Sequence, residues 1–538
     1  MLFPGKRRFG TIAIATMASG LLLVGCTSNS DNDGSGSTDA QSAPGSIGIV
    51  GDQGKGGDPV EGGTLSFAGY SPVSTLDPAK TQPAGSTGGT EMAAVYDLLV
   101  RYDATTEAFE PQLAKSLDAN DDSTVWTLKL RDGVKFSDDT PLDAEAVVAS
   151  TNRFNTNRGG NSQAFTAGVK SVEATDASTV TYTMNQPWTE FPSMLAFGHG
   201  MVVAAGSDQP DGTFKPIGAG AYTMESLAPG ADLVLQARED YWNGKPNLDT
   251  LKFVAIKDDQ PKIDALNSGG IQMAFLINDD AVDTAMATLP GYLETVSLGN
   301  SVVQINQREG RPGADVRVRK AMQMTIDPTV VDTRAKNGEG MPGTEMFQSW
   351  SKWHNDIAPV PLDTDKARAL VDEAKADGFD GKITYFTTQT QSGQATALSI
   401  QAMLQPVGID VTIEYGASVT DVVKRLYVDK DFDISTGSYS IADPAPFTRL
   451  YSALNSTSSN NIIGVDDPTM DKILSAVQTA KDDDAKRAAL ADLQTEVNST
   501  APFLPLAAGH SFVPWTDNVY GVVPSLDAIM LLDQAWIE

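Results

Sequence analysis

The sequence is poor in the side chains that most enzymes and metalloproteins use for chemistry. One cysteine, Cys26, and three histidines, His199, His354 and His510, occur in 538 residues. No paired cysteines and no His-Glu-x-x-His pattern accompany them, so the sequence predicts no metal site. A Gly-x-Ser-x-Gly turn, which would present a nucleophilic serine, is also missing. We therefore expect a protein that is not an enzyme and has no cofactor.

Basic residues are scarce as well. Lysine and arginine number 39 against 69 acidic residues, which gives a formal charge of −30. A phosphate-binding face needs clustered Lys and Arg, so nucleic acid is not an expected partner. An acidic, soluble surface explains this charge; attraction of cationic ligands is the alternative and needs local clustering of acids.

A long hydrophobic run is missing even at the N-terminus. Lys6, Arg7 and Arg8 precede an apolar run, Phe9 to Gly25, which contains Gly, Ser and Thr. That run is shorter than the roughly 20 apolar residues of a membrane-spanning helix. The order of positive, apolar and small residues is typical of an export signal rather than of a retained anchor.

The end of this run resembles a bacterial lipobox. Leu23-Val24-Gly25 precedes Cys26, and in such signals the cysteine is lipidated and becomes the mature N-terminus. Cys26 has no second cysteine to pair with, which favours lipidation over a structural thiol. We predict a signal peptide over 1–25 and a flexible, polar tether over 26–60.

What is present in the sequence is sufficient for a large folded protein. Hydrophobic residues make up 41% of the chain, and 538 residues exceed what one core supports, so two or more lobes are expected. Alternating side chains from Val125 to Leu130 predict a half-buried strand. After a break at Gly133 the strand is expected to resume over 134–136. The chain then turns into a helix with Asp143 in its first turn.

This stretch resembles a signature of the oligopeptide-type solute-binding proteins of ABC importers, the large family 5 binding proteins. The family pattern is Leu-Arg-x-Gly-Val-Lys-Phe-x-Asp-Gly-Thr-Pro, followed by a helix. The chain departs from it at Asp139, where the family prefers glycine; a turn with positive φ there would cost Asp more than Gly. Nine residues match in order: Leu130, Arg131, Gly133, Val134, Lys135, Phe136, Asp138, Thr140 and Pro141.

Further phrases of the family occur along nearly all of 61–538, among them 239–246 and 315–327. The resemblance implies an α/β, two-lobed periplasmic-binding-protein-like fold of type II, in the large oligopeptide-binding subclass, with mixed sheets. It also implies an extra subdomain in the first lobe. The implied division is as follows: first lobe 61–97, 178–304 and 506–538; extra subdomain 98–177; second lobe 305–505.

The second lobe carries its own pattern from about residue 363. Asp363-Thr364 caps a predicted helix that stops near Gly378. A strand over Ile383 to Thr387, a helix through 397–404 and a strand over Ile409 to Ile413 follow. This alternation of helices and strands predicts a mixed or parallel sheet.

Aromatic side chains in irregular segments are candidates for the ligand cleft. Phe347, Trp350 and Trp353 lie in a stretch rich in Gly and Pro. Large aromatic residues in such loops form either ligand walls or the core of the lobe, and both interpretations stay open.

The segment from 432 to 444 contains the most informative departure from the family. There the family commonly has Trp-x-x-Asp-Tyr-x-Asp/Glu-Pro, and in oligopeptide binders the first aspartate pairs with the α-ammonium of the peptide. Aligned on Asp443–Pro444, that aspartate falls on Ser440, whose hydroxyl does not neutralise a buried ammonium. Either Asp433 or Asp443 replaces it, or the ligand is not a peptide. Tyr439 remains a candidate aromatic wall.

The resemblance implies the solute-binding component of an ABC importer, held by a lipid on the outer face of the cytoplasmic membrane or in a periplasm-equivalent space. It would act as a monomer and deliver a small solute, most often a peptide, to ABC permease subunits. Alternatives on the same fold are sugars, opines and metal chelates. Alternatives of other classes are a secreted lipoprotein hydrolase and a surface signalling or adhesion lipoprotein.

Overall fold

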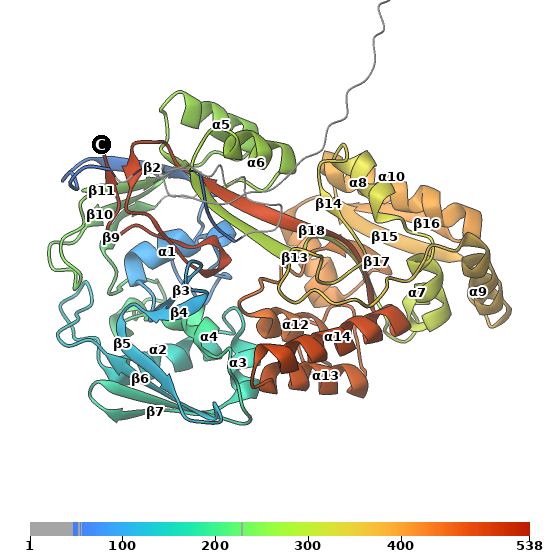
Figure 1. Cartoon of the computed structure of the whole chain (residues 1–538), viewed down its shortest axis with the longest axis horizontal. Coiled ribbons are helices and arrows are strands. Elements are labelled where there is room, and N and C mark those ends of the chain that lie inside the picture. The colour runs from blue at the N-terminus through green and yellow to red at the C-terminus, as the bar shows by residue number, and fades with distance from the viewer. Residues whose placement is uncertain (1–46, 52–53, 55, 228–229) are drawn as a thin grey trace, which may run out of the picture. The chain divides into compact units, whose positions relative to one another are not determined.

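The structure is a computed structural model that describes residues 47–51, 54, 56–227 and 230–538 (Figure 1). These residues belong to one compact unit, Ser42–Glu538. The predicted signal peptide 1–25, the lipidation site Cys26 and most of the predicted tether 26–60 lie outside the described residues. None of the described helices has the length and apolar character needed to span a bilayer.

A five-stranded mixed sheet forms the first layer. Its order is β12 (Met273–Ala274), β2 (Thr64–Ala68), β11 (Thr250–Phe253), β10 (Leu233–Ala237) and β9 (Tyr222–Leu227). β2 runs parallel to both β11 and β12, while the remaining pairs are antiparallel. Helix α1 (Gly89–Tyr96) is buried along its whole length and belongs to the core of this sheet. Helices α5 (Asp259–Asn267) and α6 (Asp279–Met286) share a hydrophobic cluster with Ala274 of β12.

A four-stranded antiparallel sheet follows in the order β5 (Ala114–Ala119), β6 (Val125–Leu130), β8 (Thr179–Met184) and β7 (Val169–Asp176). Trp126, Leu128 and Leu130 point into its core because the apolar positions alternate along β6. Helices α2 (Ala144–Thr156), α3 (Ser162–Gly168) and α4 (Pro192–Leu195) pack here, and β3 (Val100–Asp103) pairs with β4 (Ala108–Pro111).

The stretch after β6 confirms one prediction in detail and corrects another. Asp139 has φ of 68°, so the position where the family prefers glycine is a left-handed turn. The strand expected over 134–136 is wrong, because Phe136 N donates to Thr140 O and Leu142 N to Val134 O. These bonds form a tight hairpin with a single β-bridge, between Lys135 and Pro141, and no extended strand. Asp143 is the N-cap of α2 rather than part of its first turn, and it accepts from Ala146 N at 2.9 Å.

A seven-stranded mixed sheet contains the two longest strands, which run side by side through Figure 1. They are β13 (Gly291–Ile305) and β18 (Phe503–Pro514), and they pair antiparallel with an irregularity between Val296 and Val302. The path is β14 (Met341–Pro342), β18, β13, β17 (Ile434–Gly437), β15 (Lys382–Thr388) and β16 (Asp410–Gly416). β15 runs parallel to β16 and β17, as the alternating pattern predicted.

The seventh strand of this sheet is β1 (Gly48–Val50), which pairs antiparallel with Gly291–Leu293 of β13. These residues lie within the range predicted as a tether. Ile49 and Val50 have high strand propensity, and the edge of β13 offers them unpaired backbone groups. The polar tether therefore does not extend as a free chain through residues 48–50.

Four helices flank the part of this sheet formed by β15–β17: α7 (Val316–Gln323), α8 (Pro328–Ala335), α9 (Thr364–Ala376) and α10 (Gln391–Leu404). Asp363 caps α9 by accepting from Lys366 N at 2.9 Å, and Gly378 follows it with φ of 113°. Short helical turns at 419–429 follow β16.

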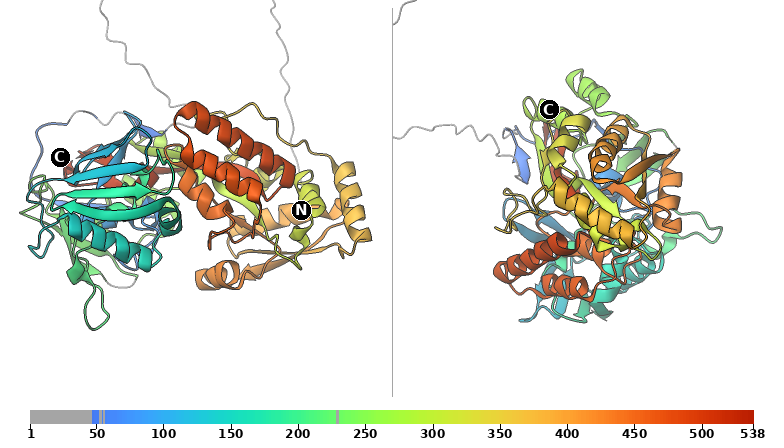
Figure 2. Two further views of the ribbon diagram at one scale, coloured as in Figure 1. Left: turned by 90° about the horizontal axis from the view of Figure 1, so that it is seen from below. Right: turned by 90° about the vertical axis from the view of Figure 1, so that its right-hand side faces the viewer.

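The three helices α12 (Pro446–Leu454), α13 (Pro468–Thr479) and α14 (Asp483–Thr500) share one core with the four-stranded sheet (Figure 2). Trp188 packs edge-on against Phe447 with ring centroids 5.5 Å apart. Lys486 of α14 pairs with Glu190 at 2.7 Å, and both side chains are buried. A C-terminal segment adds two small antiparallel strand pairs, β20 (Val523–Pro524) with β21 (Met530–Leu531) and, on either side of them in the chain, β19 (Val519–Tyr520) with β22 (Trp536–Ile537).

Candidate functional site

A cavity of about 300 Å³ lies where segments far apart in the sequence meet. Its volume is at the lower end of the range for small-molecule sites, about 300 to 1,000 Å³. The chain segments that line it are the loop after β2, the turn η1 (Gly85–Thr87), the residues after β12, the strands β13 and β18, the loop after β17, helix α12 and the turn η7 (Leu526–Ala528).

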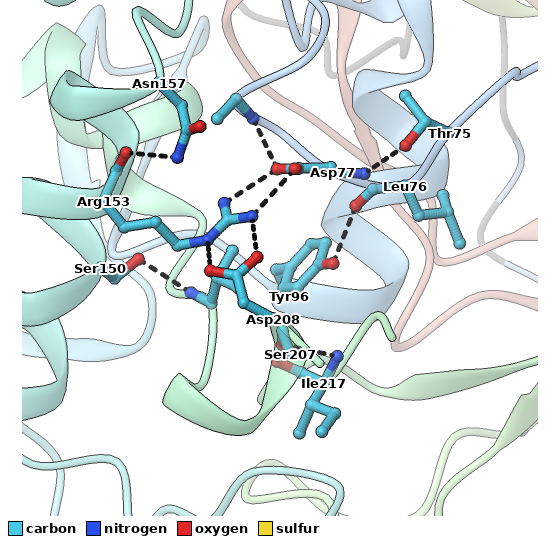
Figure 3. Close-up of polar contacts among 12 residues, drawn as sticks. Thr75, Leu76, Asp77, Tyr96, Ser150, Arg153, Asn157, Ser207, Asp208 and Ile217 are labelled. Carbon is cyan, nitrogen blue, oxygen red and sulfur yellow. Dashed lines mark hydrogen bonds and ion pairs between the residues drawn. The ribbon is translucent and has the colours of Figure 1, made fainter. Parts of the chain in front are cut away.

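The loop and turn on one side of this cavity are fixed by an ion-pair network that is buried at Asp77 and exposed at Asp208 (Figure 3). Arg153 of α2 binds Asp77 through two hydrogen bonds of 2.9 Å and Asp208 through two of 2.7 Å. Tyr96 donates to Leu76 O at 2.8 Å in the same loop. This loop leads directly into Gln82, Ala84, Ser86 and Thr87, which line the cavity.

An aromatic part of the wall is formed by Tyr70 and Phe275, with ring centroids 6.3 Å apart. Lys262 of α5 is fully buried and donates to Phe275 O at 2.9 Å, and it pairs with Asp259 at 3.2 Å. Asp259 in turn accepts from Ile277 N at 3.1 Å. The buried Lys262–Asp259 pair therefore fixes the backbone from Phe275 to Ile277, which carries part of the apolar wall.

Charged side chains also line the cavity. Arg449 of α12 binds Asp527 at 3.1 Å, and Glu294 of β13 accepts from Asp527 N at 3.1 Å. All three residues line the cavity. Burial, and next the charge of Asp527, raise the pKa of the Glu294 carboxyl well above its usual value.

A second charged group lies at the strand β18. His510 Nε2 is 3.2 Å from Asp279 Oδ1, and Lys336 Nζ donates to Asp279 Oδ2 at 2.8 Å. Burial lowers the pKa of His510, and the nearby Asp279 opposes this effect. His510 therefore lines the cavity as a neutral imidazole near pH 7.

Of the six ligand-contact residues predicted from the sequence, Ser440 lines this cavity. Its hydroxyl lies 2.6 Å from that of Ser438, and its φ is 48°. Tyr439, its neighbour, instead packs edge-on against Phe503 with centroids 5.0 Å apart, and burial raises the pKa of its hydroxyl.

The other four do not line this cavity. Phe347 and Trp353 are buried, each with 1% of its surface exposed, and Trp350 is partly buried. Trp353 Nε1 donates to Asp443 O at 2.8 Å. The Asp443 carboxylate accepts from Ser351 Oγ at 2.7 Å and from Lys352 N at 2.9 Å, so its oxygens are engaged within the protein. Ligand contact by these residues stays a prediction.

Sequence reasoning missed the acids and the arginine that do line the cavity: Glu294, Asp527 and Arg449. One signal was available, because Glu294 is a charged residue inside the otherwise uncharged run from Tyr292 to Ser297. Such a residue in a buried strand is unusual and marks a candidate site. Nothing in the local sequence indicates Asp527 or Arg449. Across the described residues, no group of three His, Cys, Asp or Glu side chains is placed to hold a metal ion.

Comparison with known proteins agrees with this architecture. The family model for bacterial extracellular solute-binding proteins, family 5, matches residues 108–461. The probable D,D-dipeptide-binding periplasmic protein DdpA of Escherichia coli K12 is 28% identical over 401 residues, covering 70% of this chain and 75% of its own.

Two solved structures have the same fold. The binding protein DppA of Helicobacter pylori, in complex with the peptide STSA, gives a TM-score of 0.75 at 24% identity and covers 89% of this chain and 99% of its own. The binding protein AgaA of A. tumefaciens R10, in complex with agropinic acid, gives a TM-score of 0.75 at 22% identity. The match covers 88% of this chain and 99% of AgaA. The predicted fold class is confirmed, and the chain belongs to the bacterial extracellular solute-binding proteins of family 5.

Proposed function

We propose that this protein is the exported, lipid-anchored solute-binding component of an ABC importer and that it binds its solute in the 300 Å³ cavity. The observation that carries the proposal is the composition of that cavity. Fixed aromatic and polar walls, contributed by segments predicted to belong to both lobes, surround a space of the size that small solutes need. Closure of the two predicted lobes would bury the solute, and an ABC permease would then receive it.

The anchor would be a lipid on Cys26. The basic residues, apolar run and Leu-Val-Gly-Cys ending support it. Labelling of cells with a radioactive or clickable fatty acid should mark the full-length protein, and Cys26→Ala should abolish both the label and membrane retention. A labelled Cys26→Ala protein would overturn the anchor without affecting the solute-binding proposal.

Peptides are the leading solute class. DdpA, at 28% identity, is described as a D,D-dipeptide-binding protein, which supports a peptide ligand for this chain. A non-peptide solute such as an opine, sugar or metal chelate is the second candidate. Ser440 favours this alternative, because a hydroxyl stands where the oligopeptide-binding pattern has an acid.

Thermal unfolding of the purified chain carrying Cys26→Ser, which blocks acylation, tests the function. The chain is mixed with pools of peptides, oligosaccharides, opine-like compounds and metal chelates. A solute present at about 100 times its dissociation constant adds roughly 2.7 kcal/mol to the unfolding free energy, a clear rise in Tm. A rise with the peptide pool supports the leading proposal, and a rise with another pool alone supports the second. No rise with any pool contradicts both.

A further inference from the structure

The two acids that the sequence offered as substitutes for the missing aspartate are engaged elsewhere. Asp443 accepts from Ser351 and from Lys352 N. Asp433 accepts from Thr384 N at 2.8 Å and pairs with Arg311 at 3.3 Å. Neither of them lines the cavity that Ser440 lines. An acid facing this cavity must therefore come from another part of the chain.

Glu294 is such an acid. Its side chain belongs to β13, lines the cavity and has 4% of the residue's surface exposed. Among the described residues, no basic side chain forms an ion pair with it. Its hydrogen bond from Asp527 N engages only the oxygen Oε1. Burial therefore favours the protonated form of Glu294 in the empty cavity, and a cation entering the cavity would favour its carboxylate form.

The surrounding charges favour a cation over an anion. Asp527 stands beside Glu294, and the one arginine of the lining, Arg449, is already paired with Asp527. His510 adds no positive charge near neutral pH because burial lowers its pKa. The lining therefore holds two acids against one paired arginine, so an entering cation has an acid available to it, whereas an entering anion has no free base.

We propose that Glu294, with Asp527 beside it, binds a cationic amino group of the solute and so replaces the acid that the family pattern has at the position of Ser440. This inference rests on the proposed solute-binding function and specifies the chemistry of the same cavity. Tyr70 and Phe275, which line the same cavity, would contact the apolar part of the solute. The amino group would donate charge-assisted hydrogen bonds to the carboxylate, which are stronger than bonds to a hydroxyl.

Titration calorimetry with three probes tests the proposal and distinguishes the sources of such a group. The probes are a pool of tripeptides with free amino termini, the same pool after N-acetylation, and putrescine, an amine without peptide bonds. The expected result is binding of an amine-bearing probe, with acetylation of the peptides weakening their binding at least about tenfold, the loss of one charge-assisted bond. Tight binding of the free peptides identifies an α-ammonium, and binding of putrescine alone identifies a side-chain-like amine.

Glu294→Gln keeps the size of the side chain and an oxygen for Asp527 N but removes the charge. We expect it to weaken binding of the amine-bearing probe at least about tenfold and to leave the acetylated pool unchanged. Glu173→Gln is the matched control, because Glu173 is exposed on β7 and does not line the cavity, and it should leave the affinity unchanged. Glu294→Gln combined with Ser440→Asp, which restores the family acid, should recover much of the lost affinity.

Asp527→Asn provides a second variant if Glu294→Gln unfolds the protein. Asparagine tolerates the left-handed conformation at this position, φ of 56°, and its loss of charge should also weaken binding of the amine. Amine binding that neither variant weakens overturns the inference. Binding of oligosaccharides or chelates without any amine-bearing probe overturns it too but leaves the solute-binding function intact, whereas no binding in any pool contradicts both.

Discussion

The carboxylate of Asp77 and the guanidinium of Arg153 meet in a bidentate pair, with both nitrogen–oxygen distances at 2.9 Å (Figure 3). Only 4% of the Asp77 side chain and 15% of the Arg153 side chain are exposed. Asp208 binds the other edge of the same guanidinium. One arginine thus joins helix α2 to the loop that leads into the cavity wall.

Replacement of Arg153 by methionine should therefore destabilise the protein strongly. Arg153→Met leaves Asp77 buried without its counter-ion, and breaking a buried pair in this way costs about 3 to 5 kcal/mol. Urea unfolding followed by tryptophan fluorescence measures the loss. Arg317→Met is the matched control, because Arg317 pairs with Asp315 and with the exposed Asp377 at the surface and should matter much less. Equal losses for the two variants would contradict the role assigned to Arg153.

Local chemistry explains why much of the fold was predictable from the sequence. Alternation placed β6 at Val125–Leu130, and the N-cap Asp363 was identified because its short carboxylate precedes a helix. These signals act between neighbours in the chain. The hairpin over 134–142 was missed although its bonds are local, because the sequence Val134-Lys135-Phe136 by itself is equally typical of an extended strand.

The cavity was harder to predict because its residues come from distant parts of the chain. Glu294 and Asp527 are 233 residues apart, and Arg449 is separated from Asp527 by 78. Their meeting depends on how β13, α12 and η7 pack, and no local pattern encodes that arrangement. Ser440 was found because a family phrase surrounds it. Trp353 and Phe347 were left open between cleft and core, and the structure buries both.

The left-handed turn at Asp139 predicts a stabilising substitution. Asp139 is exposed with φ of 68°, where a Cβ is unfavourable, so Asp139→Gly should raise the unfolding free energy. The expected gain is about 0.5 to 1 kcal/mol. Glycine removes the backbone strain of the left-handed turn, but its greater freedom in the unfolded chain offsets part of this stabilisation. Chemical denaturation is sensitive enough to detect it.

Asp138→Gly is the control for this turn. Asp138 accepts from Thr140 N at 3.1 Å, so the same change one residue earlier removes a hydrogen bond and should lower the stability. If Asp139→Gly were also destabilising, the Asp139 side chain would have to make a stabilising contact that outweighs its backbone strain.

Glu91 predicts a pH dependence of stability. It lies in α1 with 3% of its surface exposed, and burial raises the pKa of its carboxyl to about 7 from the model-peptide value of 4.5. The folded state thus binds the Glu91 proton more tightly than the unfolded state does. The stability from this proton is complete below about pH 4.5 and is lost as the pH rises through about 7, a change of about 3 kcal/mol.

Glu91→Gln should remove this loss. Between about pH 5 and 8 the unfolding free energy of the wild type should fall more steeply than that of Glu91→Gln, so that the variant is the more stable protein at pH 8. Exposed Glu61→Gln is the control and should follow the wild type. Parallel profiles for the wild type and Glu91→Gln, measured by urea unfolding at each pH, would show that Glu91 does not titrate in this range.

Asp279 and Lys336 predict an effect on the dissociation of the solute. Asp279 starts helix α6, in a segment predicted as first lobe, and Lys336 follows α8, in the predicted second lobe. Their ion pair of 2.8 Å leaves 6% of the Asp279 side chain exposed. Closure around a solute should therefore be stabilised by this contact. Lys336→Met removes it and should speed solute dissociation by about 5- to 30-fold, corresponding to about 1 to 2 kcal/mol.

The dissociation rate of the solute identified in the pools can be measured with surface-captured ligand or by stopped-flow displacement. Arg334→Met is the matched control, because Arg334 lies in the last turn of α8, two residues before Lys336, with its side chain exposed. It should leave the dissociation rate unchanged, while association in both variants should change little, since the contact forms only after the lobes meet. An unchanged dissociation rate in Lys336→Met would mean that the pair belongs equally to the open and closed states, and closure would then have to be held by the solute itself.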